Sequence, residues 1–360
     1  MSISPRTLGP APSILLVRLS SLREVLHGLP VLCALRRRFP AARITWVVEE
    51  RFAAVLEGHA ALDRVVRVSH GWLKSPCAVL RLRRELASES FDVAIDLQGL
   101  TKSAFAARLS GAAWRIGVAG REAGAVSKWF NNDLVPVRAW HVIDHYLALL
   151  RPLGIRDANV EFGLPVWPRA AREVNRFLRD RGLTVGGFAL VHPGGDSPSQ
   201  QWPPDHYAAL ARQLGANVGM PTVAAWRDTR QRELARTIVE EADGWGRLAP
   251  ATSIHELAEL TRRASLVVGS DTASLHLAVA AGTPSISLHG PTRASRTGAY
   301  GPGNLRLQAF HDERAFGRRH RRNHVGNRAL RVLSSETVYA ACARLLPLNR
   351  TSQAPSRAAA

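Results

Sequence analysis

The sequence predicts an α/β protein with two Rossmann-like, doubly wound domains that face a cleft. Short β-branched or apolar runs alternate with amphipathic helical stretches, an order typical of parallel sheets covered by helices. The alternation pauses in a stretch with one glycine and two prolines, residues 162–171, and then starts again. The length of 360 residues also exceeds the usual size of one domain.

The first domain is expected over residues 1–165. Its strands follow the runs SILLVRL, RITWVVEE, DRVVRV and FDVAIDL, at residues 13–19, 43–50, 63–68 and 91–97. Helical patterns lie between them, for example at 25–38 and 78–88. The polar residues between the first strand and the first helix are interpreted as a turn that contains Arg23 and Glu24.

The second domain is expected over residues 166–348. Its strands follow the runs GFALVHPGG, GMPTVAAW, ASLVVGS and TPSISLHGP, at residues 187–195, 219–226, 264–270 and 283–291. A last amphipathic helix is predicted at 335–346, and residues 349–360 are expected to form a disordered tail.

The charge is strongly positive, with 48 Lys and Arg against 29 Asp and Glu, which gives a formal net charge of +19. An anionic partner is therefore expected. Only Lys74, Lys102 and Lys128 are lysines, so a lysine is informative in this chain. A nucleic-acid surface is disfavoured, because aromatic residues make up only 6% of the chain and stacking platforms are scarce.

The three cysteines, Cys33, Cys77 and Cys342, are far apart and lack metal-ligand spacing. They support neither a disulfide framework nor a zinc site, and a reducing, cytoplasmic setting is expected. The first residues lack the apolar core of a signal peptide, and no run approaches the length of a membrane span. No metal is expected.

A doubly wound sheet also invites the interpretation as a dinucleotide-dependent oxidoreductase. That function needs a G-x-G-x-x-G sequence after a strand. The first domain has LSSLRE at the corresponding place and the second has HPGGDS, so this class is disfavoured.

The strongest chemical signal is VVGSDTASLHLAVAAGTPSISLHGPT, residues 267–292. A buried strand runs into Ser270, Asp271 and Thr272, which are all good helix N-cap residues, and a helix follows. The free N–H groups of that helix start form an anion site suited to a diphosphate. The alternative is that Asp271 only caps the helix and that His276 is an ordinary core histidine. The following LHGPT favours a binding site, because a second strand-end loop is expected beside the first.

Several motifs in order resemble glycosyltransferase family 9, the bacterial lipopolysaccharide heptosyltransferases, and most of all the inner-core enzymes that add the first heptose. SSLREVLHGLP stands where the family has S-S-x-G-D-x-L-x-x-L-P, and WVVEERFA, DLQGLTKSA, GREAGAVSKWFNN and HVIDHY follow. HPGG, QQWP, SDTASLHL, HGPT and GAYGP complete the order. The resemblance runs from about residue 14 to 346.

This resemblance implies a glycosyltransferase-B fold and transfer of a heptose from ADP-heptose to a Kdo sugar on lipid A, with inversion at the anomeric carbon. It implies no metal and no cofactor. The N-terminal domain is expected to bind the acceptor and the C-terminal domain the ADP-activated donor. The leaving diphosphate is expected to be stabilised by a helix start and by positive side chains.

The resemblance also assigns roles to individual residues. Glu24 takes the place of the family's catalytic aspartate, as the base for the acceptor hydroxyl. The acceptor-binding candidates are Ser20, Ser21, Arg23, Lys102, Arg121 and His141. The donor-binding candidates are Gly194, Gly195, Gln200, Asp271, Thr272, Ala273, His276, Gly290 and Arg293. For Arg121 and His141, the alternative is an ordinary solvated side chain.

Four motifs depart from the family pattern: Arg23-Glu24 replaces Gly-Asp, Gln200 replaces a lysine, Ala273 replaces a glycine and Arg293 replaces an aspartate. Arg293 is a candidate to restore the charge lost at Gln200. Two functions stay open: an active heptosyltransferase, and a catalytically weak or inactive homologue that binds a nucleotide sugar or an anionic glycolipid. The segment 316–338 has no cysteines where many relatives have several, which excludes an iron or zinc site there.

Two groups of cations favour contact with an anionic bilayer. One is the run Arg36, Arg37 and Arg38, and the other lies in WLKSPCAVLRLRREL beside Trp72 and Leu73. Taken alone, each also fits an ordinary solvated helix face. The expected location is the cytoplasm, with peripheral contact at the inner face of the inner membrane.

Overall fold

The computed structural model describes residues 7–120, 124, 126–195, 200–290, 292–309 and 328–346. The chain divides into two compact units, Met1–Val166 and Trp167–Ala360. Each unit is described by itself. Arg121, the tail 349–360 and most of the segment 316–338 lie outside the described residues.

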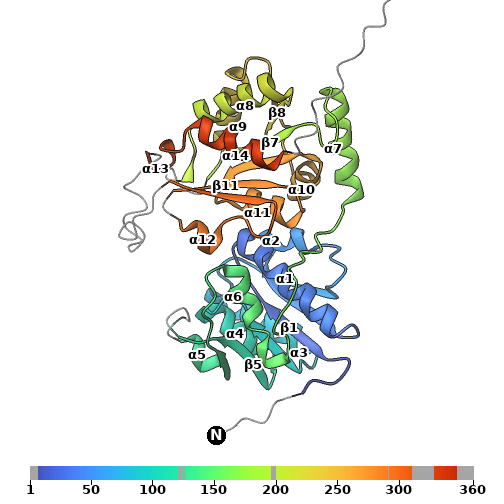
Figure 1. Cartoon of the computed structure of the whole chain (residues 1–360). Helices are drawn as coiled ribbons and strands as arrows, with labels where there is room; N and C mark the ends of the chain where they lie inside the picture. Colours follow the sequence, from blue (N-terminus) through green and yellow to red (C-terminus); the bar gives the residue numbers. More distant parts are fainter. Residues whose placement is uncertain are drawn as a thin grey trace, which may run out of the picture. The chain divides into compact units, whose positions relative to one another are not determined.

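The first unit, coloured blue to green in Figure 1, has a parallel sheet of six strands in the order β3-β2-β1-β4-β5-β6. The strands are β1 Ser13–Val17, β2 Arg43–Glu49, β3 Arg64–Val68, β4 Val93–Asp96, β5 Trp114–Val118 and β6 Asp133–Val135. The α-helices are α1 Leu22–Arg38, α2 Glu50–Ala53, α3 Pro76–Ala87, α4 Thr101–Leu109, α5 Ser127–Phe130 and α6 Val142–Ala148. Short 3₁₀ turns are η1 Ala54–Leu56, η2 Trp72–Lys74 and η3 Arg151–Leu153.

The second unit, coloured green to red in Figure 1, has the same topology, with a parallel sheet in the order β12-β11-β10-β7-β8-β9. The strands are β7 Ala189–His192, β8 Thr222–Ala224, β9 Gly246–Leu248, β10 Leu266–Ser270, β11 Ser285–His289 and β12 Asn304–Gln308. The helices are α7 Pro168–Asp180, α8 Pro204–Val218, α9 Thr229–Glu240, α10 Ile254–Arg263, α11 Ala273–Ala280, α12 Ala294–Thr297, α13 Arg328–Arg331 and α14 Ser335–Leu345.

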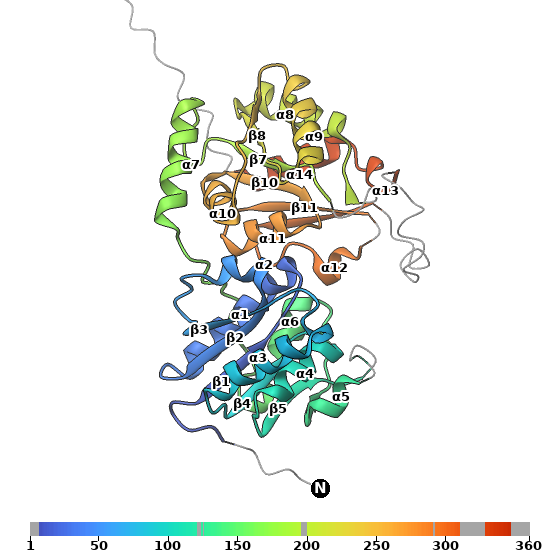
Figure 2. The ribbon, with the colours of Figure 1, turned by 180° about the vertical axis from the view of Figure 1, so that it is seen from behind.

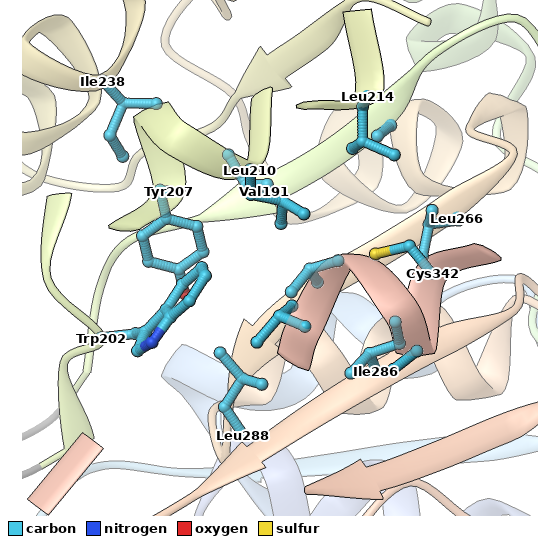
Figure 3. Packing of buried hydrophobic residues seen from close by; sticks show 14 of the residues in the cluster. Val191, Trp202, Tyr207, Leu210, Leu214, Ile238, Leu266, Ile286, Leu288 and Cys342 are labelled. Atoms are coloured by element: carbon cyan, nitrogen blue, oxygen red, sulfur yellow. The ribbon is translucent and has the colours of Figure 1, made fainter. Parts of the chain in front are cut away.

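Helices cover both faces of the second sheet, and each face has its own apolar core. On one face the strands pack against α8, α9 and α14, where the Trp202 and Tyr207 rings lie edge to face with centroids 4.6 Å apart (Figure 3). On the other face they pack against α7, α10 and α11, around Phe188 and Leu260. These features confirm the predicted α/β class with two Rossmann-like halves.

The structure corrects the predicted start of the first helix. Arg23 and Glu24 do not stand in a turn: α1 begins at Leu22, so both belong to its first turn. Ser21 is the N-cap and Glu24 is the third helical residue, and together they form a capping box. The helix therefore supplies the rigid frame that holds the Glu24 carboxylate.

Candidate active site

Candidate residues of the first unit follow the carboxyl ends of two neighbouring strands in the middle of the sheet. Ser20, Ser21 and Glu24 come after β1, and Lys102 comes after β4, which pairs directly with β1. The strand order reverses between β1 and β4. In doubly wound sheets ligands bind outside the carboxyl ends of the strands at this switch point.

The Glu24 carboxylate is held by three neighbours, although its side chain is still 20% exposed. Its Oε2 accepts from the Ser21 N–H at 3.2 Å and from the Ser21 hydroxyl at 2.8 Å. The same oxygen lies 3.3 Å from Nη2 of Arg18, while Oε1 lies 3.1 Å from Nη2 of Arg23. The carboxylate is thus fixed between its own helix start and two guanidinium groups.

These contacts decide the protonation state of Glu24. Burial raises its pKa, but the charges of Arg23 and Arg18 and the hydrogen bonds from Ser21 outweigh burial and hold the pKa below its ordinary value. Glu24 is therefore ionised at neutral pH and able to accept a proton. Arg23 occupies Oε1, so a substrate hydroxyl that approaches this oxygen must displace the Arg23 guanidinium.

Arg18 is a site residue that the sequence analysis missed. It is buried at the end of β1, where Nη1 donates to the Leu97 carbonyl at 3.1 Å and the guanidinium lies 5.2 Å from the centre of the Tyr146 ring. Leu97 and Tyr146 are far away in the sequence, so no local pattern shows these contacts. Arg18 acts as a fixed counter-charge behind Glu24.

Lys102 lies in a second polar cluster. Its Nζ donates to the Ser20 hydroxyl at 3.0 Å and to Oε1 of Glu49 at 2.8 Å. Glu49, at the end of β2, has a side chain only 2% exposed, and its Oε2 also contacts Arg51 at 2.8 Å and Nδ1 of His70 at 3.3 Å. Glu49 was not singled out from the sequence, although the run WVVEERFA contains it.

A buried carboxylate shapes the loop before Lys102. Asp96 ends β4, and its Oδ1 accepts from the N–H groups of Gln98 and Gly99 at 3.0 Å each. Its Oδ2 accepts from Nδ2 of Asn131 at 3.0 Å. Burial raises the pKa of Asp96 in spite of these bonds. Asp96 therefore orders the backbone that leads into α4.

His141 lies below the surface, unlike the solvated side chain considered as the alternative. It is the N-cap of α6, and its Nδ1 accepts from the Ile143 N–H at 3.2 Å. Its ring meets the ring of His27 from α1 edge to face, with centroids 6.1 Å apart. In this structure His141 helps to hold α6 beside α1.

The donor-binding candidates of the second unit follow three adjacent strands, β7, β10 and β11. After β10, Oδ1 of Asp271 lies 3.0 Å from Nε2 of His276, and Oδ2 accepts from the Thr297 hydroxyl at 2.9 Å. The Asp271 and His276 side chains are 1% and 2% exposed. Asp271 is therefore a buried residue that positions His276 and Thr297, and it does not cap the helix.

The cap of α11 is Thr272, whose side chain makes no cap hydrogen bond. Its hydroxyl is buried and has no hydrogen-bond partner among the described residues. Ala273 is the first residue of the helix, so its methyl group is accommodated in a regular helical turn. The hydroxyl and the first N–H groups of α11 are the parts that an anion needs.

Two glycines after β7 have little room for a side chain. A Cβ on Gly195 would lie 2.7 Å from the Gln200 carbonyl oxygen, and one on Gly194 would lie 2.4 Å from the Gln231 amide nitrogen. After β11, the Gly290 carbonyl accepts from Gln308 at 2.8 Å, and Arg293 is the exposed residue before α12. At Gly194 and Gly195 neighbouring atoms thus lie close to the backbone, and these glycines follow the carboxyl end of a strand in the same sheet as the strand before Thr272.

No group of three or more His, Cys, Asp or Glu side chains suited to a metal ion occurs in the part of the chain that the structure describes. Among the described helices, none has the length and apolar composition needed to cross a membrane.

Two Rossmann-like units, each with polar side chains gathered at the switch point of its sheet, make up the glycosyltransferase-B fold. The model of glycosyltransferase family 9 (heptosyltransferase) matches residues 79–324. The chain belongs to this family.

Curated relatives match most of the chain. Lipopolysaccharide heptosyltransferase 1 of Escherichia coli K12 is 28% identical over 309 residues, which cover 82% of this chain and 93% of the relative. Lipopolysaccharide heptosyltransferase 1 of Pseudomonas aeruginosa is 29% identical over 313 residues, which cover 82% of this chain and 83% of the relative. The predicted family and enzyme class are confirmed.

Solved structures share the fold. A family 9 glycosyltransferase from Veillonella parvula superposes with a TM-score of 0.82 at 22% identity, covering 95% of this chain and 99% of the other. An Escherichia coli heptosyltransferase with ADP superposes with a TM-score of 0.74 at 24% identity, covering 92% of this chain and 99% of the other.

Proposed function

We propose that this enzyme transfers a heptose from ADP-heptose to a Kdo sugar of the lipopolysaccharide inner core, with inversion at the anomeric carbon. The identity of 28–29% to lipopolysaccharide heptosyltransferase 1 of two species supports the sugar and the pathway. The single structural observation that carries the proposal is the Glu24 carboxylate, held ionised at the switch point of the first sheet.

In this mechanism Glu24 accepts the proton of the acceptor hydroxyl while the hydroxyl oxygen attacks the anomeric carbon. The bond from that carbon to the diphosphate breaks on the opposite face, which inverts the configuration. Arg18 keeps Glu24 ionised from behind, at 3.3 Å. Arg23 yields Oε1 to the acceptor, because its side chain is the more exposed of the two arginines.

The leaving ADP gains negative charge as the bond breaks. The start of α11 and the Thr272 hydroxyl are assigned to this diphosphate, with His276 held in place by Asp271. Arg293 is assigned as the cation that replaces the lysine expected at Gln200. Gly194, Gly195 and Gly290 let the backbone approach the donor.

The acceptor carries carboxylates, and arginine and lysine side chains suit them. Lys102, with its neighbours Ser20 and Ser21, is assigned to these groups, as is Arg121 by its position in the sequence. Lys102 and Arg51 both contact Glu49, whose single negative charge balances one of their two positive charges. One positive charge is therefore left for the acceptor. The first unit is therefore the proposed acceptor side and the second the donor side, with transfer at the cytoplasmic face of the inner membrane.

Donor binding and turnover test the proposal separately. Calorimetry is expected to show binding of ADP-heptose, and Kdo-lipid A is expected to accept the sugar, with the new bond of inverted configuration by NMR. The Glu24→Gln variant is expected to lose about a hundredfold or more in kcat while ADP-heptose affinity stays unchanged. Glutamine still completes the capping box, so the helix start is kept.

Each contrary result has a distinct meaning. Binding of ADP-heptose without transfer to Kdo-lipid A points to the inactive, ligand-binding homologue. Failure to bind any nucleoside diphosphate removes the donor assignment. Retained turnover in Glu24→Gln moves the base to another residue.

A further inference from the structure

Exposed cations of η2, α3 and α5 form no ion pair with a carboxylate in the part of the first unit that the structure describes. Lys74, Arg81, Arg83, Arg84 and Lys128 are exposed, and none forms an ion pair with a carboxylate among the described residues. Other arginines of this unit behave differently: Arg36 binds Asp63 at 2.6 Å and Arg37 binds Glu161 at 2.5 Å. The run 36–38 was expected to face a membrane, but Arg36 and Arg37 form ion pairs within the first unit.

Apolar side chains are exposed among these cations. Leu73 is 41% exposed, Leu80 is 49% exposed and Trp129 is 79% exposed. On α3, Cys77, Leu80, Arg81 and Arg84 lie on one helix face, because they are three or four residues apart. The acidic residue of α3, Glu85, lies four residues after Arg81 at the margin of this face, and its carboxylate contacts Arg64 at 3.4 Å.

Helix α4 lies between α3 and α5 and packs against both. Helices α3, α4 and α5 follow one another along the unit (Figure 2). Trp72, which the sequence analysis placed on the basic face, is buried and stacks on Phe105 of α4 with centroids 6.2 Å apart. Phe105 in turn meets Phe130 of α5 at 5.5 Å. In the sequence, Leu73 follows Trp72 at one end of this row of rings, and Trp129 precedes Phe130 at the other end.

We propose that this surface, the α3–α5 face, docks the enzyme on an anionic phospholipid membrane. The face is defined by Leu73, Lys74, Cys77, Leu80, Arg81, Arg84, Lys128 and Trp129. Its cations match phosphate headgroups, and its leucines and tryptophan suit the boundary between headgroups and acyl chains. A nucleic acid would use the charges but gain nothing from the exposed leucines. The inference does not depend on the proposed sugar transfer.

The test is co-sedimentation of the full chain with phosphatidylcholine vesicles that contain or lack phosphatidylglycerol. Binding is expected only to the anionic vesicles, and it is expected to weaken as salt is raised. Each neutralised cation is expected to lower the partition constant about fivefold, so Arg81→Gln with Arg84→Gln lowers it roughly 25-fold. Trp129→Ala is expected to weaken binding in a salt-independent way, because it removes apolar contact.

A matched control makes the same charge change elsewhere. Arg169 and Arg172 of α7 are exposed, three residues apart and on the other unit. Replacing both by glutamine is expected to leave vesicle binding within about twofold of the unmodified chain. Unchanged thermal unfolding of all variants shows that the fold is intact.

Cys77 offers a direct reading of contact at the face. It is exposed, whereas burial raises the pKa of Cys33 to about 11 and that of Cys342 to about 12. An environment-sensitive dye therefore reacts first at Cys77. Its emission is expected to shift to the blue on addition of anionic vesicles, and the shift is expected to vanish in the Arg81→Gln, Arg84→Gln double variant.

Several results would overturn the proposal. Equal binding to neutral vesicles, or equal losses in the α3 and α7 variants, would show that the face has no specific role. Tighter binding to a DNA or RNA oligonucleotide than to vesicles, lost in the α3 variant, would assign the face to nucleic acid. Self-association lost in the same variant would assign it to a second copy of the chain.

Discussion

Glu24 has two arginine neighbours that act on it from different sides. Arg18 is buried and tied to the Leu97 carbonyl and the Tyr146 ring, so its charge stays in place whether or not substrate is bound. Arg23 is more exposed and lies 3.1 Å from the second carboxylate oxygen. The buried arginine therefore fixes the carboxylate, and the exposed one tunes its basicity and its access.

The Arg23→Ala change tests this division. Removing the nearer charge is expected to raise the pKa of Glu24, because burial already favours the neutral acid and Arg23 opposes burial. A carboxylate base is active above its pKa, so the acid limb of kcat/KM is expected to move to higher pH. The pH profile of transfer to Kdo-lipid A measures this shift.

Arg172→Ala, on α7, is the matched control and is expected to leave the acid limb in place. An acid limb that stays fixed in Arg23→Ala would show that Arg23 does not control the protonation of the base. If the acid limb moves in both Arg23→Ala and Arg172→Ala, the shift reflects the change in net charge and not the position of Arg23.

Part of this site is visible in the sequence. Ser21 followed three residues later by Glu24 is the signature of a capping box, and it predicts a helix that starts at residue 22. The prediction of a turn that contains Arg23 and Glu24 overlooked that signature. The partners Arg18 and Glu49 are different, since their contacts with Tyr146 and Lys102 join segments that are 128 and 53 residues apart and depend on the folded sheet.

Among the elements, strands that lie within long apolar runs of the sequence were predictable, and strands outside such runs were not. The eight strands predicted from apolar runs all occur, although each is shorter than its run. Strands β5, β6, β9 and β12 were not predicted, because sequences such as DLV and GRL are too short or too polar to show a period. Their neighbours in the sheet, rather than their own residues, decide that they are extended.

A core tryptophan links helices of the second unit. Trp202 is fully buried against Tyr207 of α8, and its Nε1 donates to the Leu333 carbonyl at 2.8 Å, just before α14 (Figure 3). Trp202→Ala is expected to lower the free energy of unfolding by about 3–5 kcal/mol, because it leaves a cavity and an unpaired carbonyl. Denaturant unfolding monitored by circular dichroism measures the loss.

Trp129→Ala provides the comparison for that change, since it removes the same side chain from an exposed position of α5. Its effect on unfolding is expected to stay within about 0.5 kcal/mol. Similar losses for the two variants would show that Trp202 is not a core residue in solution.

At the scale of the whole molecule, the same topology occurs twice and carries two different sets of polar residues. In both sheets the strand order reverses next to the first strand of the unit. The reversal lies between β1 and β4 in the first sheet and between β7 and β10 in the second. The first unit places a carboxylate and cations at its switch point, whereas the second places a helix start, a buried hydroxyl and small residues. A base and a diphosphate site are thus assigned to different units by the residues that follow equivalent strands.

This division predicts that nucleotide binding belongs to the second unit alone. Among the described residues, its two apolar cores draw on positions between Val174 and Leu346. Trp167, at the start of the unit, donates its N–H to Glu259 at 3.0 Å and stacks on His255 with centroids 4.4 Å apart. A fragment of residues 167–360 is therefore expected to fold cooperatively and to bind ADP, with a rise in Tm that grows with ADP concentration. Residues 1–166 are expected to show no such rise. A folded second fragment that ignores ADP would contradict the assignment of the donor to α11, and an unfolded one would show that its cores are not sufficient by themselves.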